Sequence, residues 1–446
     1  MYPNEILVYC MFVLLFIAIM SGFPVAFGLG GVALIIGVIG EYMGEFYFSD
    51  FSFIPQRLYG IMQKFTLMAV PMFIFMGLTL EKSGLAAELL ESLQQIFKRL
   101  KGGLAISIVL VGALLAASTG IVGATVVTMG AMALPTMLKW GYNKELACGT
   151  IAASGTLGQI IPPSIVLVLL GDMMNIDVGD LFIGAILPGF LLVFIYIIYI
   201  FLRVHFNPAL APSHSDLIND EAETDLKKVT MALLPPIFLM VIVLGSILFG
   251  FASPTEASAC GALGALLITA FKKRLKLNVL KDIMQETTKM TCMVFTILVG
   301  AQFFGVVFRG LGGDEMISSL ILDNEIDRYL VLISVMLLMF LMGFFLDFIE
   351  ICFIVIPIVC PLLINDLEFN GLWLAILIAI NLQTSFLTPP FGFALFYLKG
   401  VAPPEITTLH IYKGVAPFVL MQIATIAILM LFPDIVTYLP KIVFSN

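Results

Sequence analysis

The chain has 446 residues, of which 61% are hydrophobic and 12% are charged, and its formal net charge is −8 at pH 7. A soluble domain carries roughly 25% charged residues, so this composition excludes a soluble protein and indicates an integral membrane protein. The acidic balance argues against a nucleic-acid partner. The six cysteines are scattered in or beside apolar stretches, without the spacing that metal ligands show.

Apolar stretches long enough to span a bilayer, about 20 residues each, follow one another along the whole chain. The first begins within MYPNEILVYC, which has no basic residue before its apolar run. We therefore interpret it as a membrane helix rather than a cleaved signal. The only long polar stretch covers residues 207–228, about the length of one loop. The predicted fold class is an all-α polytopic membrane protein.

Proline pairs interrupt two of the apolar stretches. ASGTLGQIIPPSIVLVLLG at 153–171 and NLQTSFLTPPFGFALFYLKG at 381–400 both place hydroxyl residues before the pair and an apolar run after it. Pro162 and Pro389 lie 227 positions apart. Other residues recur at 226 to 230 positions: Pro135 with Pro361, Gly77 with Gly305, Gly84 with Gly312, and Pro24 with Pro254. Two halves with matched broken helices are typical of secondary transporters.

Basic residues indicate that the two halves have opposite orientations in the membrane. The positive-inside rule assigns the clusters KRLK at 98–101 and KKRLK at 272–276 to the cytoplasm. Their repeat partners, 322–328 and 40–50, are mostly acidic or have no basic residue. We therefore predict an inverted repeat. Residues 1–205 form its first copy, 206–228 a cytoplasmic linker, and 229–446 its second copy.

Two segments are predicted to be re-entrant hairpins with tips near the membrane midplane, at about 103–139 and about 328–365. The first segment has both ends in the cytoplasm and the second has both ends outside. The middle of the first, AASTGIVGAT, offers Ser118, Thr119 and Gly120 for a turn, and the second contains Gly343 and Asp347. Irregular backbone at this depth requires a protein or wet surrounding. A carboxylate such as Asp347 at this depth is usually paired or functional.

The broken helices are predicted at about 145–171 and about 370–398. A prolyl nitrogen has no hydrogen to donate, so each proline pair removes the usual donors of two carbonyls four residues earlier. These are the carbonyls of Gly158 and Gln159 in the first break, and of Ser385 and Phe386 in the second. A small hard cation prefers such oxygens together with hydroxyls. Thr156, Thr384 and Thr388 supply hydroxyls nearby.

The half-helix that begins after each proline pair points its N-terminus at the break. Free N–H groups and the positive end of the helix dipole attract an anion there. Ser164 follows the first pair, and Gly392 follows the second. Each break can therefore hold a cation on one side and an anionic group on the other.

Three stretches carry a resemblance to a known family: GTLGQIIPPSIVLVLLGD, FASPTEASACGALGAL and NLQTSFLTPPFGFALFYLKGVAPPEI. They resemble the large membrane subunit of tripartite ATP-independent periplasmic (TRAP) transporters, the DctM-like permeases, over essentially the whole chain. Within that family the chain looks most similar to the branch associated with mannitol, chloroaromatic compounds and α-keto acids. The resemblance implies a multi-pass protein of the bacterial inner membrane that imports an organic acid in a sodium-driven elevator mechanism.

The resemblance also implies partners and ligands. The partners are a small four-helix membrane subunit and a periplasmic substrate-binding protein that delivers a carboxylate solute. At least two sodium ions are implied, and their ligands are carried over by motif as Ser118, Gly120, Thr156, Gly158, Asp347, Thr384, Ser385 and Thr388. The residues assigned to the solute are Ser118, Thr119, Ser164, Asp347 and Gly392.

Three alternatives stay open at this stage. A proton-driven organic anion carrier would use Asp347 as its proton site. A channel would need more polar helix faces than these apolar stretches offer. A membrane-embedded enzyme is disfavoured, because the chain has neither a GxSxG nor an HExxH motif and nothing pairs an acid with a plausible nucleophile.

Overall fold

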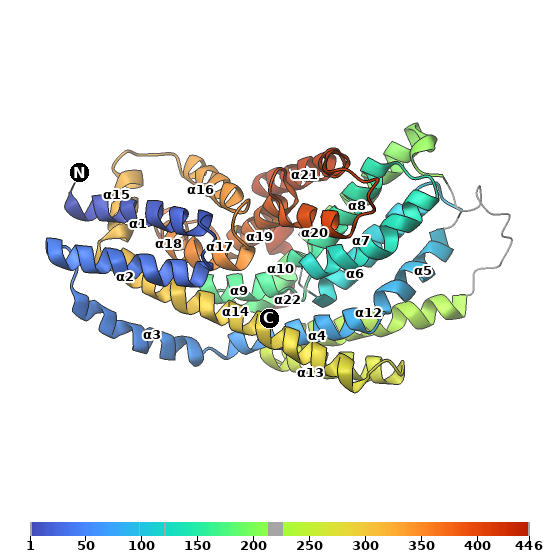
Figure 1. Cartoon of the computed structure of the whole chain (residues 1–446), viewed down its shortest axis with the longest axis horizontal. Coiled ribbons are helices and arrows are strands. Elements are labelled where there is room, and N and C mark those ends of the chain that lie inside the picture. Colours follow the sequence, from blue (N-terminus) through green and yellow to red (C-terminus); the bar gives the residue numbers. More distant parts are fainter. Residues whose placement is uncertain (1, 98, 120–121, 213–225, 445–446) are drawn as a thin grey trace. The chain divides into compact units, whose positions relative to one another are not determined.

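The computed structural model describes residues 2–97, 99–119, 122–212 and 226–444. Within these ranges the regular secondary structure is helical, as predicted (Figure 1). Nine of the described helices are long and apolar enough to cross a membrane. A tenth candidate is the pair Phe348–Ile354 and Ile356–Asp366, which is bent by 44°. The all-α polytopic class is therefore confirmed.

The chain divides into two compact units. Unit 1 comprises Met1–Phe65, Lys289–Met342 and Leu346–Gly371, and unit 2 comprises Thr66–Thr288, Gly343–Phe345 and Leu372–Asn446. Each unit thus draws on both halves of the sequence. The repeat boundaries at 205 and 229 and the cytoplasmic position of the linker stay predictions. Residues 213–225 of that linker lie outside the described part.

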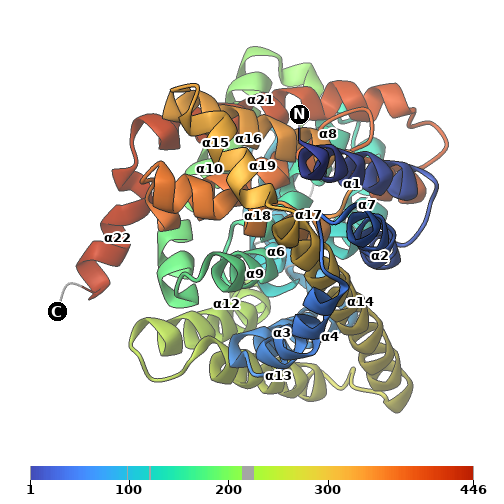
Figure 2. The same cartoon turned by 90° about the vertical axis from the view of Figure 1, so that its left-hand side faces the viewer.

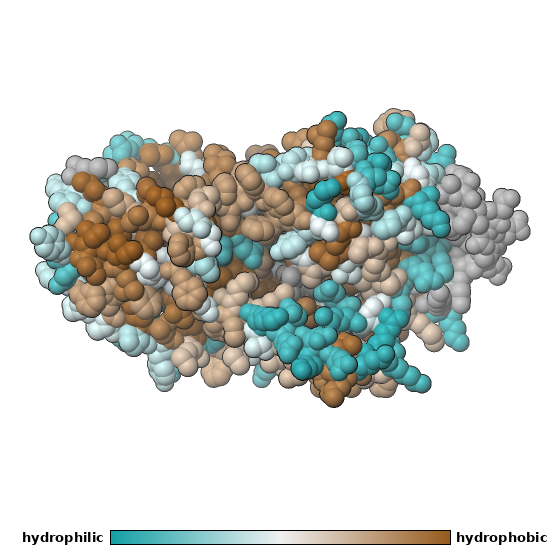
Figure 3. All heavy atoms as spheres, viewed as in Figure 1, coloured by the Kyte–Doolittle hydropathy of each residue, from teal (hydrophilic) through white to brown (hydrophobic). Residues whose placement is uncertain are grey.

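Unit 1 holds the first two candidate spanning helices and the segment predicted as the second hairpin apart from Gly343–Phe345. Its helices are α1 (Pro3–Met20), α2 (Val25–Met43), α3 (Phe53–Met62), α15 (Gly313–Leu322), α16 (Arg328–Met342), α17 (Phe348–Ile354) and α18 (Ile356–Pro361). α14 (Leu277–Gly310) begins in unit 2 and continues into unit 1. α1 packs against α2 and α15 (Figure 2). Hydrophobic side chains cover much of the visible face of α1 and α2 (Figure 3).

Unit 2 holds the first hairpin and both predicted breaks. Its helices are α4 (Ala69–Lys82), α5 (Leu85–Phe97), α6 (Gly103–Thr119), α7 (Val122–Lys139), α8 (Lys144–Thr156), α9 (Ile165–Met174), α10 (Val178–Phe206), α12 (Leu226–Leu248), α13 (Pro254–Phe271), α19 (Gly371–Leu387, whose first residue falls in unit 1), α20 (Phe393–Val401), α21 (Thr408–Leu431) and α22 (Asp434–Phe444).

Capping side chains fix where several of these helices begin. Asn143 accepts a hydrogen bond of 3.0 Å from the N–H of Leu146 and caps α8. Ser253 and Glu256 form a reciprocal capping box at the start of α13. Their side chains accept hydrogen bonds from two N–H groups that have no carbonyl partner within the helix. Glu256 therefore has a structural role at the start of this helix.

Left-handed turns recur in the two halves of the chain. Eleven described residues have a positive φ, and ten of them form five pairs that lie 223 to 229 positions apart. The pairs are Gly22 with Gly250, Gly44 with Lys273, Gly84 with Gly312, Gly102 with Glu325, and Gly141 with Glu368. Because an L-residue other than glycine rarely adopts this conformation, the matches support the repeat by backbone geometry, independently of the proline pairs.

Candidate ion and solute site at the paired breaks

The first break lies between α8 and α9. α8 ends at Thr156 and passes into a single 3₁₀ turn, Leu157–Gln159. The Pro162–Pro163 peptide bond is cis, and α9 begins at Ile165. The side chains of Thr156, Gln159 and Ser164 are fully buried. The break is therefore a polar element enclosed by apolar helices.

The second break repeats this arrangement between α19 and α20. α19 ends at Leu387, the Pro389–Pro390 peptide bond is cis, and α20 begins at Phe393. A Cβ at Gly392 would lie 2.5 Å from the Phe386 carbonyl oxygen and 2.9 Å from that of Thr388. Only glycine fits at this position without a shift of the backbone. The Gly392 N–H donates to the Thr388 carbonyl over 3.1 Å.

The hydroxyl groups at both breaks share one hydrogen-bond pattern. Each donates to a carbonyl of its own helix three or four residues earlier: Thr156 to Ala153 (2.9 Å), Thr384 to Ile380, Ser385 to Leu382 and Thr388 to Thr384 (each 2.7 Å). A hydroxyl that donates its hydrogen keeps its oxygen lone pairs as acceptors. These four oxygens can therefore contact a cation without losing the bonds that hold them.

Two of the four carbonyls that lose their usual donors to the prolines accept hydrogen bonds from other groups. The Ser164 hydroxyl donates to the Gln159 carbonyl over 2.8 Å. The Thr388 N–H donates to the Ser385 carbonyl over 3.1 Å. In both bonds the donor lies five or three residues after the carbonyl, in place of the residue four positions later that a regular helix would use. The Gly158 carbonyl has no hydrogen-bond donor within the described ranges, and Pro390 cannot donate to Phe386.

The first hairpin packs against both breaks. α6 and α7 each contact the 3₁₀ turn of the first break, and Gly155 of α8 lies against Val126 of α7. Gly123 of α7 lies against Tyr397 of α20. Ser118 and Thr119 are the last two residues of α6, but their side chains and Gly120 lie outside the described part. Their predicted roles as ligands stay predictions.

Asp347 begins the helix that follows the turn of the second hairpin segment. Its Oδ1 accepts a bond of 2.7 Å from the Phe348 N–H, and its own N–H donates to Glu350 over 2.9 Å. Asp347 is therefore the N-cap of α17 in a capping box with Glu350. Asp347 belongs to unit 1 and Thr384–Thr388 to unit 2, so an ion site shared by them stays a prediction.

Sequence reasoning missed the side chain of Gln159. It is fully buried, and neither Oε1 nor Nε2 has a hydrogen-bond partner within the described ranges. An unpaired buried amide costs about 1–3 kcal/mol and calls for an explanation. The signal was present in the sequence as a lone amide between Gly158 and the proline pair.

Nine described helices that are long and apolar enough to span a membrane, together with the repeated breaks, define a multi-pass helical membrane protein with a transporter-like fold. The solved structure of the Alcanivorax borkumensis YdaH transporter matches 86% of this chain and 89% of its own, with a TM-score of 0.61 at 14% identity. Residues 8–435 match the family described as "Tripartite ATP-independent periplasmic transporter, DctM component". The chain belongs to this family, whose members are transport components of the bacterial inner membrane rather than enzymes.

Curated relatives agree with this assignment. The C4-dicarboxylate TRAP transporter large permease protein DctM of Pseudomonas aeruginosa is 31% identical over 86% of this chain and 87% of its own. The ectoine TRAP transporter large permease protein TeaC of Halomonas elongata is 29% identical over 96% and 97%. The sialic acid TRAP transporter large permease protein SiaM of Vibrio cholerae is 26% identical over 95% and 96%. The resemblance to the large permeases is confirmed.

Proposed function

We propose that this chain is the permease through which a tripartite system imports an organic acid, driven by a sodium gradient. One observation carries the proposal: two repeat-matched breaks in unit 2 present four hydroxyl oxygens that have donated their hydrogens into their own helices. Such oxygens are acceptors, and acceptors at helix breaks are what a small hard cation binds.

The donor set at each break fits sodium by its chemistry. The first break offers the Thr156 hydroxyl, the Gly158 carbonyl and the unpaired Gln159 amide oxygen. The second offers the hydroxyls of Thr384, Ser385 and Thr388. All are uncharged oxygens. Such ligands can replace the hydration shell of a monovalent ion, but they would compensate poorly for the larger hydration energy that a divalent cation loses on binding. We propose at least one ion at each break, with Asp347 as a further ligand at the second.

The solute is proposed to be an anion with a carboxylate. The N-terminus of α9 at Ser164 and that of α20 at Gly392 carry the positive ends of their helix dipoles. The names of relatives give C4-dicarboxylate, sialic acid and isethionate as solutes, which are carboxylates or a sulfonate. An α-keto acid, as the motif resemblance implies, belongs to the same chemical class.

The transport movement is proposed to be an elevator. Unit 2 contains the first hairpin and both breaks in one compact body, so these parts can move together. A small four-helix membrane subunit would complete the membrane part, and a periplasmic binding protein would deliver the solute.

Uptake in proteoliposomes that contain the chain and both partners tests the proposal. The solute is first identified by thermal-shift screening of the binding protein against dicarboxylates, α-keto acids, sialic acid, ectoine, mannitol and chloroaromatic acids. We expect uptake to follow an inward sodium gradient and to ignore an imposed pH gradient. Uptake that follows only the pH gradient would identify a proton-coupled carrier. Ion conductance in the absence of both gradients would identify a channel.

A further inference from the structure

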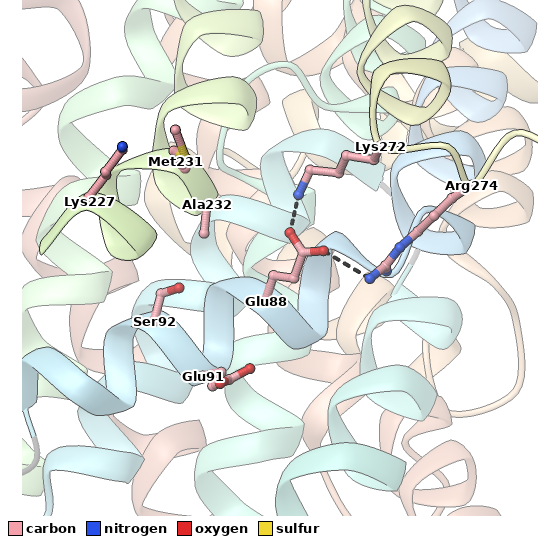
Figure 4. Close-up of a pocket in the computed structure, with 8 residues that line it drawn as sticks. All are labelled: Glu88, Glu91, Ser92, Lys227, Met231, Ala232, Lys272 and Arg274. Carbon is pink, nitrogen blue, oxygen red and sulfur yellow. Dashed lines mark hydrogen bonds and ion pairs between the residues drawn. The ribbon is translucent and has the colours of Figure 1, made fainter. Parts of the chain in front are cut away.

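A charged cavity of about 430 Å³ lies at one end of unit 2 between α5, α12 and the loop after α13 (Figure 4). α12 begins here and α13 ends here, so two antiparallel spanning helices meet the cavity at the same end. Its lining is Glu88, Glu91, Ser92, Lys227, Met231, Ala232, Lys272 and Arg274. The cavity contains none of the residues assigned to ion or solute.

Glu88 holds two of the three cations of the cavity in place. Its carboxylate pairs with the Lys272 ammonium and, over 2.9 Å, with the Arg274 guanidinium (Figure 4). Arg274 also donates to the Ser83 carbonyl over 2.6 Å. An ammonium has three donors and a guanidinium five, so both cations keep donors beyond these bonds. The cavity therefore presents fixed N–H donors rather than loose surface chains.

The formal charge of the cavity selects the class of ligand. Lys227, Lys272 and Arg274 contribute three positive charges, and Glu88 and Glu91 contribute two negative charges. The net charge of +1 matches one monoanion. A phosphodiester carries one negative charge at neutral pH, whereas free phosphate carries between one and two.

Apolar stripes lead away from the cavity along both spanning helices. On α12, Met231, Leu234 and Phe238 are 63%, 60% and 60% exposed at helical spacing. On α13, Leu267 and Phe271 are 49% and 83% exposed, and Phe271 directly precedes Lys272. In a bilayer, exposed apolar side chains on spanning helices can contact the acyl chains of lipids. A ligand with a charged head and long apolar chains fits the cavity and both stripes together.

We propose that this cavity binds the phosphodiester head group of an anionic membrane lipid such as phosphatidylglycerol. The basic loop 272–276 is predicted to be cytoplasmic, and juxtamembrane Lys and Arg residues attract anionic lipids there. The lipid would tie α5 to the ends of α12 and α13.

Native mass spectrometry of the delipidated full-length chain, titrated with phosphatidylglycerol or phosphatidylcholine, tests the proposal. We expect one phosphatidylglycerol to bind in clear preference to phosphatidylcholine. Replacing Lys227 and Lys272 together by Gln should weaken this binding at least about 10-fold, because each basic residue near a membrane surface contributes about a fivefold preference. Lys273→Gln is the matched control, because Lys273 is exposed and does not line the cavity; it should weaken binding by no more than about fivefold, the general contribution of one basic residue near the membrane surface.

Equal weakening by the control, or unchanged binding in the double variant, would overturn the proposal. Displacement of the lipid by millimolar inorganic phosphate would instead identify a free-anion site. Should the double variant fail to fold, Glu91→Gln decides, because it raises the formal charge of the cavity to +2. It should tighten phosphatidylglycerol binding severalfold, and unchanged or weaker binding would contradict a charge-selected site. None of these measurements depends on transport.

Discussion

The Thr128 hydroxyl of α7 donates a hydrogen bond of 3.1 Å to Oε1 of Glu81 at the end of α4. Oε2 of the same carboxylate is buried and has no hydrogen-bond partner within the described residues. Within the described residues, the Thr128 hydroxyl is the side-chain donor that joins this acid to the first hairpin. A half-paired carboxylate in a spanning segment makes that donor important for stability.

We expect Thr128→Val to lower the free energy of unfolding by about 1–3 kcal/mol, because it leaves both oxygens of Glu81 without a donor. Thermal unfolding in detergent measures the effect. Thr136→Val is the control on the same helix, since the Thr136 hydroxyl bonds only the Met132 carbonyl of its own helix. An equal loss in both variants would refute a special role for the bond to Glu81.

Gln159→Leu should raise stability and lower uptake. The substitution removes a buried amide that has no partner among the described residues, which is worth about 1–3 kcal/mol, but it also removes an oxygen proposed to contact the ion. Gln422→Leu is the matched control. Gln422 is also buried and its Oε1 also has no partner among the described residues, but its Nε2 donates to the Tyr196 hydroxyl over 2.7 Å, so the loss of this bond should lower stability relative to Gln159→Leu. A Gln159→Leu variant that is less stable than the parent protein would show that the amide has a structural partner.

Replacing Pro389 and Pro390 together by Ala should restore backbone donors and allow the helix to continue through the break. Stability in detergent should be maintained or increased, while sodium-driven uptake should be lost. The same is expected for Pro162 and Pro163. The control is the pair Pro235–Pro236, which lies inside the continuous helix α12; its double Ala variant should keep uptake. Normal uptake after either break is repaired would mean that the breaks are not an ion site.

Asp347→Asn should preserve folding, because Asn is also a good N-cap residue. If Asp347 contacts sodium, the apparent affinity for sodium should fall by roughly 10- to 100-fold, which corresponds to one charge-assisted contact of about 1.5–3 kcal/mol. Uptake measured against sodium concentration gives this affinity. Glu350→Gln, in the same capping box, serves as the comparison, and an unchanged sodium dependence in Asp347→Asn would assign the acid to capping alone.

The inverted topology predicts which loops an impermeant thiol reagent reaches. In a background without the exposed cysteines Cys10, Cys260 and Cys292, a cysteine at Glu45 or Asp323 should react from outside whole cells. A cysteine at Lys273 should react only after the membrane is opened. Reaction of all three positions from one side would rule out an inverted repeat.

The sequence predicted the element types and both breaks because their signals are local. A run of apolar residues marks a span wherever it occurs, and prolines remove donors within their own helix. A proline pair alone is still insufficient, as Pro235–Pro236 inside α12 shows. What distinguishes the two breaks is the preceding stretch that combines glutamine with hydroxyl residues, as in GTLGQ and QTSFLT.

The side-chain environment of the site could not be predicted, because it depends on contacts between segments far apart in the chain. No local pattern reveals that the Ser164 hydroxyl turns back to the Gln159 carbonyl, or that Thr128 reaches Glu81 from 47 positions away. The division into units is likewise a property of long-range packing: it combines the first hairpin with α19 and α20, which the sequence separates by more than two hundred residues.

The five matched left-handed turns bear on the history of the chain. In three of them the first half has glycine where the second has Lys273, Glu325 or Glu368. A backbone shape that persists while its side chain changes is what duplication of an ancestral half-length gene followed by divergence would leave. Glycine adopts this shape at the least steric cost, so the second copy carries the strained residue at each of the three turns. The first copy is thus a template for engineering the second: glycine at positions 273, 325 and 368 would remove the φ strain there.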